Sequence, residues 1–123
     1  MKKRILIADD DKGIVELLKI GLEEMGYEVS FALNGVDAMQ MALRGNMPDL
    51  IIIDVMMPRM DGFELCSLLK SNPKTENIPM LFCTAEGSLG DIDKGLGIGA
   101  AGYIVKPFDF EKVKEKINQI LNM

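Results

Sequence analysis

Four short apolar runs in the sequence are each followed directly by a polar side chain that could take part in chemistry. The side chains that follow them are Asp9 and Asp10, Asp54, Thr84 and Lys106. Carboxylates held together at 4 Å repel one another by about 4 kcal/mol per pair at an effective dielectric near 20. A hard divalent cation relieves this repulsion, and Mg²⁺ suits one or two carboxylates together with water and a phosphate oxygen. Carboxylate nucleophile, metal, lysine and hydroxyl donor would together be suited to accepting a phosphoryl group.

Each of these residues has a simpler interpretation when it is taken alone. Asp54 could end a strand and solvate a loop, and Asp9 and Asp10 could be solvated loop acids. Thr84 could satisfy loop backbone groups, and Lys106 could be a lysine with a buried stem and an amine in water. Four such features at four successive strand ends favour one shared site over coincidence.

The apolar runs predict a parallel sheet that would bring these residues together. Four consecutive aliphatic residues, Leu50–Ile53, are typical of a central strand that is covered on both faces. Residues 28–32 alternate in polarity, which predicts a half-exposed edge strand. Five predicted strands alternate with five predicted helices, so we expect right-handed crossovers and helices on both faces of the sheet. Ligands of such sheets bind beyond the carboxyl ends of the strands.

The predicted helices begin at polar caps and mostly end at glycine or proline. Glycines predict the ends of the first two helices at Gly26 and Gly45, and Ser71-Asn72-Pro73 the end of the third. Residues 88–98 predict a fourth helix that glycines interrupt, and each glycine costs about 0.5–1 kcal/mol relative to alanine. We therefore expect it to be the least stable part of the fold. The residues predicted to cap the other four helices are Asp11, Asn34, Asp61 and Asp109.

Composition excludes several classes of function. The chain has 123 residues, enough for one domain with a real core. A formal net charge of -5 argues against direct binding to nucleic acid, and the lack of histidine removes histidine-based catalysis and metal sites. The two cysteines, Cys66 and Cys83, are expected to be buried free thiols. No run is long enough to cross a bilayer and no secretory signal is present, so we expect a cytoplasmic protein without a membrane partner.

Four segments, in order, resemble the motifs of two-component response-regulator receiver domains. The resemblance covers the whole chain. It implies an α/β fold of the flavodoxin-like, doubly wound class, with a five-stranded parallel sheet in the order 2-1-3-4-5. It also implies that residues 1–123 form a single receiver domain, with no output domain in this chain. The matching segments are Ile5 to Asp10, Leu50 to Pro58 with Asp61-Gly62, Phe82-Cys83-Thr84-Ala85, and Tyr103 to Phe108.

The resemblance also assigns a role to each candidate site residue. Asp54 would be the phosphoacceptor and would take its phosphoryl group from a histidine on a sensor histidine kinase or a histidine phosphotransfer protein. Asp10, Asp54 and the backbone carbonyl of Met56 would ligate Mg²⁺, or Mn²⁺ in its place, and Asp9 would act through water. Transfer of this kind would make the chain a signalling switch in a phosphorelay.

The remaining matches concern the phosphoryl oxygens and the response to them. Thr84 and Lys106 would contact the oxygens, and the small Ala85 would leave room for the group. Thr84 would be drawn toward the phosphoryl group and Tyr103 would turn inward, which would bias the face formed by helix 4, strand 5 and helix 5. The bond from Lys106 to Pro107 would be cis.

Two other interpretations are kept as alternatives. Asp9-Asp10-Asp11 contains the DxD of phosphatases with an aspartate nucleophile, in which Asp9 would be the nucleophile. A pseudo-receiver would use the same surface for binding only, although every site residue is present. A flavin-binding flavodoxin relative is not expected, because the acidic edge would repel the cofactor phosphate and no phosphate loop of Ser, Thr or Gly follows the first strand. We expect a monomer or a phosphorylation-dependent dimer that slowly hydrolyses its own aspartyl phosphate and turns over no external substrate. The sequence names neither the kinase nor the downstream partner.

Overall fold

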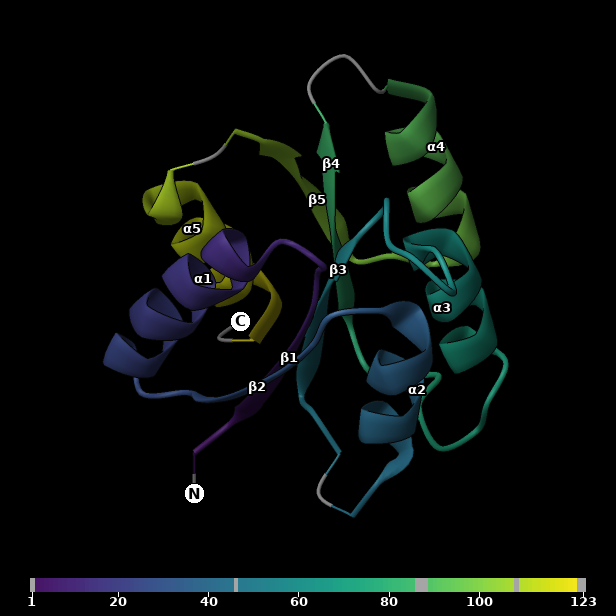
Figure 1. The fold of residues 1–123 in the computed structure, drawn as a ribbon, viewed down its shortest axis with the longest axis horizontal. Coiled ribbons are helices and arrows are strands. Elements are labelled where there is room, and N and C mark those ends of the chain that lie inside the picture. Colours follow the sequence, from purple (N-terminus) through teal and green to yellow (C-terminus); the bar gives the residue numbers. More distant parts are fainter. Residues whose placement is uncertain (1, 46, 86–88, 108, 122–123) are drawn as a thin grey trace.

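One parallel sheet organises the protein. The computed structural model describes residues 2–45, 47–85, 89–107 and 109–121. The strand order is β2-β1-β3-β4-β5, and every neighbouring pair is parallel (Figure 1). This confirms the doubly wound α/β fold and the order expected from the resemblance. The strands are β1 (Arg4–Ala8), β2 (Glu28–Ala32), β3 (Leu50–Asp54), β4 (Met80–Ala85) and β5 (Gly102–Lys106).

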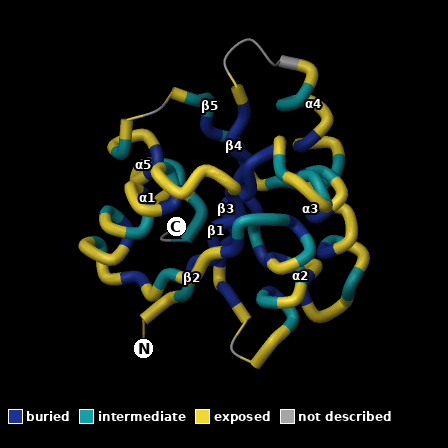
Figure 2. The backbone as a smooth tube through the Cα atoms, viewed as in Figure 1, coloured by how far each residue is buried: buried dark blue, intermediate teal, exposed yellow. Residues whose placement is uncertain are grey.

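Helices cover both faces of the sheet. α1 and α5 lie on one face, and α2, α3 and α4 lie on the other (Figure 1). Side chains of β1 alternate accordingly: Ile5 and Ile7 pack in the α1–α5 core, whereas Leu6 and Ala8 pack in the core beneath α2 and α3. The strands form the buried centre of the molecule between exposed helix surfaces (Figure 2). The helices are α1 (Lys12–Glu24), α2 (Gly35–Leu43), α3 (Gly62–Lys70), α4 (Leu89–Ile98) and α5 (Phe110–Leu121).

Burial along the strands agrees with the sequence pattern. All five residues of β3 are buried, as expected for a central strand. β2 lies at the sheet edge and keeps Phe31 43% exposed. Cys66 and Cys83 are buried free thiols, as predicted, and burial raises the pKa of Cys83 to about 12. In the described part of the chain, no helix has both the length and the apolar character needed to cross a membrane.

All four predicted caps are observed. Asp11 accepts hydrogen bonds from two backbone N–H groups at the start of α1. Asn34, Asp61 and Asp109 each accept one bond from the backbone three residues ahead. Gly26 has a positive φ of 97°, the left-handed conformation that favours glycine after a helix. Local sequence therefore determines where these helices begin.

The predicted fourth helix, with its glycines, is present as α4. Gly95 is buried in it, and a Cβ there would lie 2.7 Å from the ring of Phe82. Gly90 and Gly97 differ, because a Cβ on either would meet nothing within 4 Å. One of the three glycines is therefore required by packing, and the other two only weaken the helix. Ser88, where the predicted helix began, lies outside the described residues.

Candidate functional site

Strand register brings the polar strand ends together at one edge of the sheet. Ala8 pairs with Ile53, which places Asp9 beside Asp54. Asp54 pairs with Cys83 on the other side, directly before Thr84. β5 completes the edge, because Lys106 pairs with the last residue of β4. All four strand ends predicted to meet do so.

Three carboxylates form the acidic part of this edge. One oxygen from each of Asp9, Asp10 and Asp54 lies within 4.8 Å of the other two. Asp9 and Asp54 are buried, whereas Asp10 is exposed. Oxygen ligands from two or three carboxylates, open to solvent on one side, fit a hard divalent cation that keeps part of its water shell.

Lys106 partly neutralises the buried acids. Its Nζ lies 3.1 Å from Asp9 Oδ2 and 3.1 Å from Asp54 Oδ1. Burial, together with the charge of Asp9, raises the pKa of Asp54 to about 6, although Lys106 opposes the shift. Burial lowers the pKa of Lys106, but the two carboxylates raise it further, so its pKa lies above its ordinary value. One lysine therefore does not fully offset the cluster, and a second cation would be favourable here.

Thr84 carries a buried hydroxyl without a partner. Its Oγ1 is the one buried side-chain oxygen or nitrogen in the described part of the chain that makes no hydrogen bond. Leaving such a group unsatisfied typically costs about 1–3 kcal/mol. The observation argues against the simpler interpretation, in which Thr84 satisfies loop backbone. Its place beside Asp54 suits a donor for a group bound at Asp54.

The other residues assigned by resemblance lie around this cluster. Ala85 ends β4 and is exposed, and Met56 follows β3 by two residues with its side chain outside the core. The bond between Lys106 and Pro107 is cis, as expected. Tyr103 is half-buried, and Lys116 Nζ lies 5.5 Å from the centre of its ring. Phe108, the last residue of the fourth matching segment, lies outside the described residues.

Two glycines that hold the site were not singled out as site residues by the sequence analysis. A Cβ on Gly62 would overlap the carbonyl oxygen of Asp54, and the Gly62 N–H donates to Val55 O at 2.9 Å. A Cβ on Gly35 would overlap the carbonyl oxygen of Met60, in the loop after β3. In the sequence both glycines only follow a helix cap, Asn34 or Asp61, and nothing local shows the tertiary contact.

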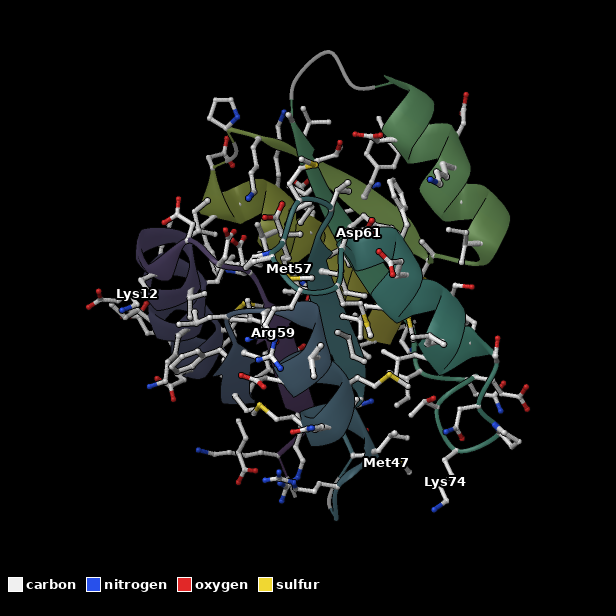
Figure 3. The ribbon with its side chains drawn as sticks, turned by 45° about the vertical axis from the view of Figure 1, so that its right-hand side comes forward. Lys12, Met47, Met57, Arg59, Asp61 and Lys74 are labelled. Atoms are coloured by element: carbon white, nitrogen blue, oxygen red, sulfur yellow. The ribbon has the colours of Figure 1, made fainter. Side chains whose placement is uncertain are left out.

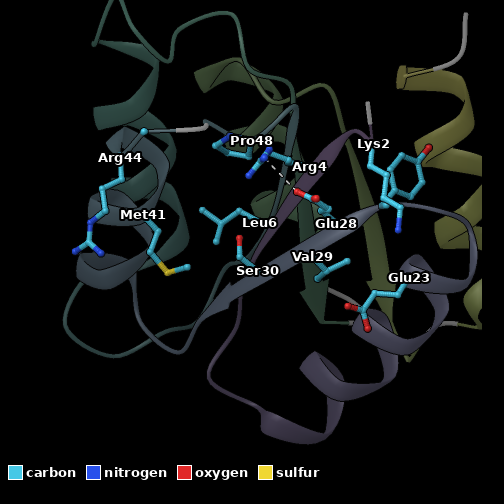
Figure 4. Close-up of a pocket in the computed structure, with 12 residues that line it drawn as sticks. Lys2, Arg4, Leu6, Glu23, Glu28, Val29, Ser30, Met41, Arg44 and Pro48 are labelled. Atoms are coloured by element: carbon cyan, nitrogen blue, oxygen red, sulfur yellow. Dashed lines mark ion pairs between the residues drawn. The ribbon is translucent and has the colours of Figure 1, made fainter.

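A surface hollow of about 730 Å³ lies at the opposite end of the sheet (Figure 4). It is lined by residues at the amino ends of β1 and β2 and at the carboxyl end of α2, among them Lys2, Arg4, Glu28 and Arg44. Arg4 and Glu28 form an ion pair of 3.3 Å within it, and both side chains are more than a third exposed. This hollow contains none of the converging strand-end residues, so the acidic edge is the stronger candidate site.

The geometry weakens the phosphatase interpretation. The DxD reading needs Asp11 as a general acid, but its carboxylate accepts the backbone N–H groups of Gly13 and Ile14. Asp9, the nucleophile in that reading, is buried and paired with Lys106. It also accepts the N–H of Asp11 at 2.9 Å. Asp9 and Asp11 thus have structural partners, and Asp54 lies at the centre of the cluster.

Comparison with known proteins agrees with this arrangement. Residues 5–118 match the response regulator receiver domain. The chain is 41% identical over 118 residues to the DNA-binding dual master transcriptional regulator RpaA of Synechocystis sp., covering 96% of this chain and 48% of that protein. The chain spans about half the length of this curated relative.

Solved structures share the fold. The chemotaxis response regulator CheY4 of Vibrio cholerae is 32% identical and has a TM-score of 0.91, covering 98% of this chain and 100% of that chain. The receiver domain of sensor histidine kinase PA1611 from Pseudomonas aeruginosa PAO1 has a TM-score of 0.90, with full coverage of both chains. It is described with a magnesium ion in its active site cleft, but at 23% identity this likeness shows the fold alone.

The family match spans nearly the whole chain, the RpaA identity is high, and the strand order is the one expected. Together these findings show that this chain belongs to the response regulator receiver domain family, whose members act in phosphorylation-dependent signal transduction.

Proposed function

We propose that Asp54 is the phosphoacceptor of a signalling switch, and that it takes its phosphoryl group from a phosphohistidine on a sensor histidine kinase or a histidine phosphotransfer protein. The observation that carries this proposal is the convergence of Asp9, Asp10 and Lys106 on Asp54, with Lys106 Nζ 3.1 Å from an Asp54 oxygen. The family match supports the same role.

Mg²⁺, or Mn²⁺ in its place, would be held by Asp10, Asp54 and the backbone carbonyl of Met56, with Asp9 acting through water. When bound, the ion supplies positive charge that offsets the carboxylates and the incoming phosphoryl oxygens. The carboxylate cluster, in which Lys106 contacts only two of the three acids, supports this choice. The magnesium described in the PA1611 receiver domain is consistent with it.

The chain's own residues would carry the transfer. An Asp54 oxygen forms the new bond to phosphorus as the phosphorus–nitrogen bond to histidine breaks, and the histidine nitrogen keeps the electron pair. Lys106 already lies beside Asp54 and would hold the phosphoryl oxygens by charge. Thr84 would donate its unpartnered hydroxyl to the same group, and the small side chain of Ala85 would leave the approach open. Positioning and charge neutralisation account for most of such catalysis.

The same contacts would operate the switch. Donation from Thr84 to the phosphoryl group would draw its side chain toward Asp54, and Tyr103 would turn into the space that is left. Tyr103 is half-buried in this structure, so part of its side chain is still exposed and would become buried on turning inward. The surface that changes would be formed by α4, β5 and α5.

The chain would act as one receiver domain over residues 1–123. It would work in the cytoplasm, as a monomer or a phosphorylation-dependent dimer, without direct contact with nucleic acid or membrane. It would slowly hydrolyse its own aspartyl phosphate and turn over no external substrate.

Incubation with acetyl phosphate and Mg²⁺, followed by intact-mass measurement, tests the proposal. Wild-type protein should gain one phosphoryl group, and Asp54→Asn should gain none. Omitting Mg²⁺ should suppress the gain, because the carboxylates then repel the donor. Phosphoryl uptake that persists in Asp54→Asn, or that is abolished only in Asp9→Asn, would point instead to the phosphatase interpretation. Absence of uptake by the wild type would leave the binding-only pseudo-receiver.

A further inference from the structure

We propose that the first turn of α2 positions the β3–α3 loop (residues 55–61), so that Gly35 is a positioning residue for the phosphoacceptor site. The inference deepens the proposed function and rests on it. Gly35 lies 19 residues before Asp54 in the sequence and belongs to a different element. It would act on the metal and the phosphoryl group only through the loop.

The contact between α2 and the loop leaves no space. Gly35 is the first residue of α2 and is buried. A Cβ added to it would overlap the carbonyl oxygen of Met60 and lie 2.7 Å from Met60 Cβ, whereas ordinary contact begins at 3.4 Å. Gly35 has no positive φ, so alanine is compatible with its backbone. The requirement for glycine therefore comes from the loop alone.

The loop is held in a tight conformation at this contact. The Met60 N–H donates to the carbonyl oxygen of Pro58 at 2.8 Å, which closes a three-residue turn around Arg59. Arg59 has a φ of 69°, a conformation that is rare and strained for a residue other than glycine. Such a conformation persists only where the surroundings impose it. The contact with Gly35 is one such restraint.

A second link joins the same two elements. Arg59 Nη1 lies 3.6 Å from Asp37 Oδ1, and Asp37 in turn accepts a bond from the side chain of Asn34, the α2 cap. The labelled side chain of Arg59 lies across α2, below Met57 (Figure 3). Both partners are more than half exposed, so this ion pair alone is weak. The ion pair orients the loop relative to α2, next to the close contact with Met60 that the absence of a Gly35 side chain allows.

The other end of the loop is fixed to the acceptor. Gly62 packs against the Asp54 backbone, and its N–H donates to Val55 O at 2.9 Å. Met56, whose carbonyl is the proposed metal ligand, lies between Val55, which this bond holds, and Met60, which contacts Gly35. A shift of Met60 while Val55 is held in place therefore changes the path of the residues between them, and Met56 is one of these residues. Displacements near 1 Å can cost about 100-fold in a positioned reaction.

Gly35→Ala tests the inference. We expect the Mg²⁺ dissociation constant, measured by calorimetry, to rise, and the acetyl phosphate rate at saturating Mg²⁺ to fall about 10- to 100-fold. Gln40→Ala is the control, because Gln40 is an exposed residue of the same helix and lies outside the proposed site and switch surface, and the Mg²⁺ affinity and rate of this variant should equal those of the wild type. A folded Gly35→Ala protein with wild-type Mg²⁺ affinity and rate would overturn the inference.

A measurement on the wild type does not depend on whether the variant folds. Coupling between two sites is reciprocal, so Mg²⁺ should slow amide hydrogen exchange at Met60 and at Ala38, whose N–H closes the first turn of α2. Typical couplings correspond to about fivefold or more. The amide of Glu28, bonded to Lys3 O at the far end of the sheet, should not respond. Unchanged exchange at both Met60 and Ala38 would also overturn the inference.

The two proposals fail differently. If wild-type protein takes up no phosphoryl group, the proposed function fails. If it does take one up and Gly35→Ala retains the wild-type Mg²⁺ affinity and rate, only the role of Gly35 fails.

Discussion

Glycine serves opposite purposes in two regions of this molecule. Around Asp54, Gly35 and Gly62 are required because backbone atoms of other segments occupy the space of a side chain. In α4, Gly90 and Gly97 face open space and no contact requires them. The same residue type therefore permits close packing at the acceptor and weakens a helix on the face proposed to respond.

The difference shows how one small fold can hold a precise site beside a less stable surface. Chemistry at Asp54 needs atoms held to within a fraction of an ångström. A responsive surface instead needs a small free-energy gap between its conformations. Substitutions that crowd the acceptor site or that strengthen α4 are the most direct tests of this difference.

Gly62→Ala should have the largest effect. Its methyl group would overlap the Asp54 carbonyl oxygen, which cannot move without shifting β3. Overpacking of this kind costs about 1–3 kcal/mol, so the urea midpoint should fall, and phosphoryl uptake should fall with it. If stability were unchanged, the contact with Asp54 would be more yielding than the structure indicates, and the contrast with α4 would fail.

Thr84→Val should separate stability from function within the acceptor region. Removing a buried hydroxyl that has no partner should raise the free energy of unfolding by about 1 kcal/mol in metal-free protein. Phosphoryl uptake should decrease, because the donor to the phosphoryl oxygen is lost. Urea unfolding and intact-mass measurement on the same sample check both effects. Lower stability would mean that the hydroxyl has a partner after all.

Gly97→Ala and Gly90→Ala should have the smallest effects, and of opposite sign to Gly62→Ala. Each should raise the free energy of unfolding by up to about 0.5–1 kcal/mol, because glycine loses more backbone entropy than alanine in a helix. Gly95→Ala is the control within α4: its methyl group would lie 2.7 Å from the Phe82 ring, so it should destabilise. Equal effects at all three positions would show that packing does not distinguish them.

Much of the fold could be predicted because its signals are local. Runs such as Leu50–Ile53 indicate buried strands, and Asp11 and Asn34 indicate helix starts, whatever the rest of the chain does. The convergence of Asp9, Asp54 and Lys106 then follows from the rule that parallel strands end at one edge. These expectations were confirmed.

Contacts between distant segments could not be predicted in the same way. The interrupted pattern of residues 88–98 does not distinguish Gly95, where an added Cβ would overlap the Phe82 ring, from Gly97, where an added Cβ would meet nothing within 4 Å. Gly35 is likewise read from sequence as an ordinary helix start, because Met60 lies 25 residues away. The missing hydrogen bond of Thr84 is also invisible until its neighbours are placed. The roles of the site residues come from resemblance and stay predictions.

The amine of Lys106 has a further geometric consequence. An ammonium group carries three N–H donors, and among the described residues its ion pairs are with the carboxylates of Asp9 and Asp54. One donor direction therefore remains for a newcomer without breaking either existing pairing. A phosphoryl oxygen arriving at Asp54 would accept this third N–H and would not compete with either carboxylate. The Lys106 side chain would therefore stay in place while the phosphoryl group is added and removed.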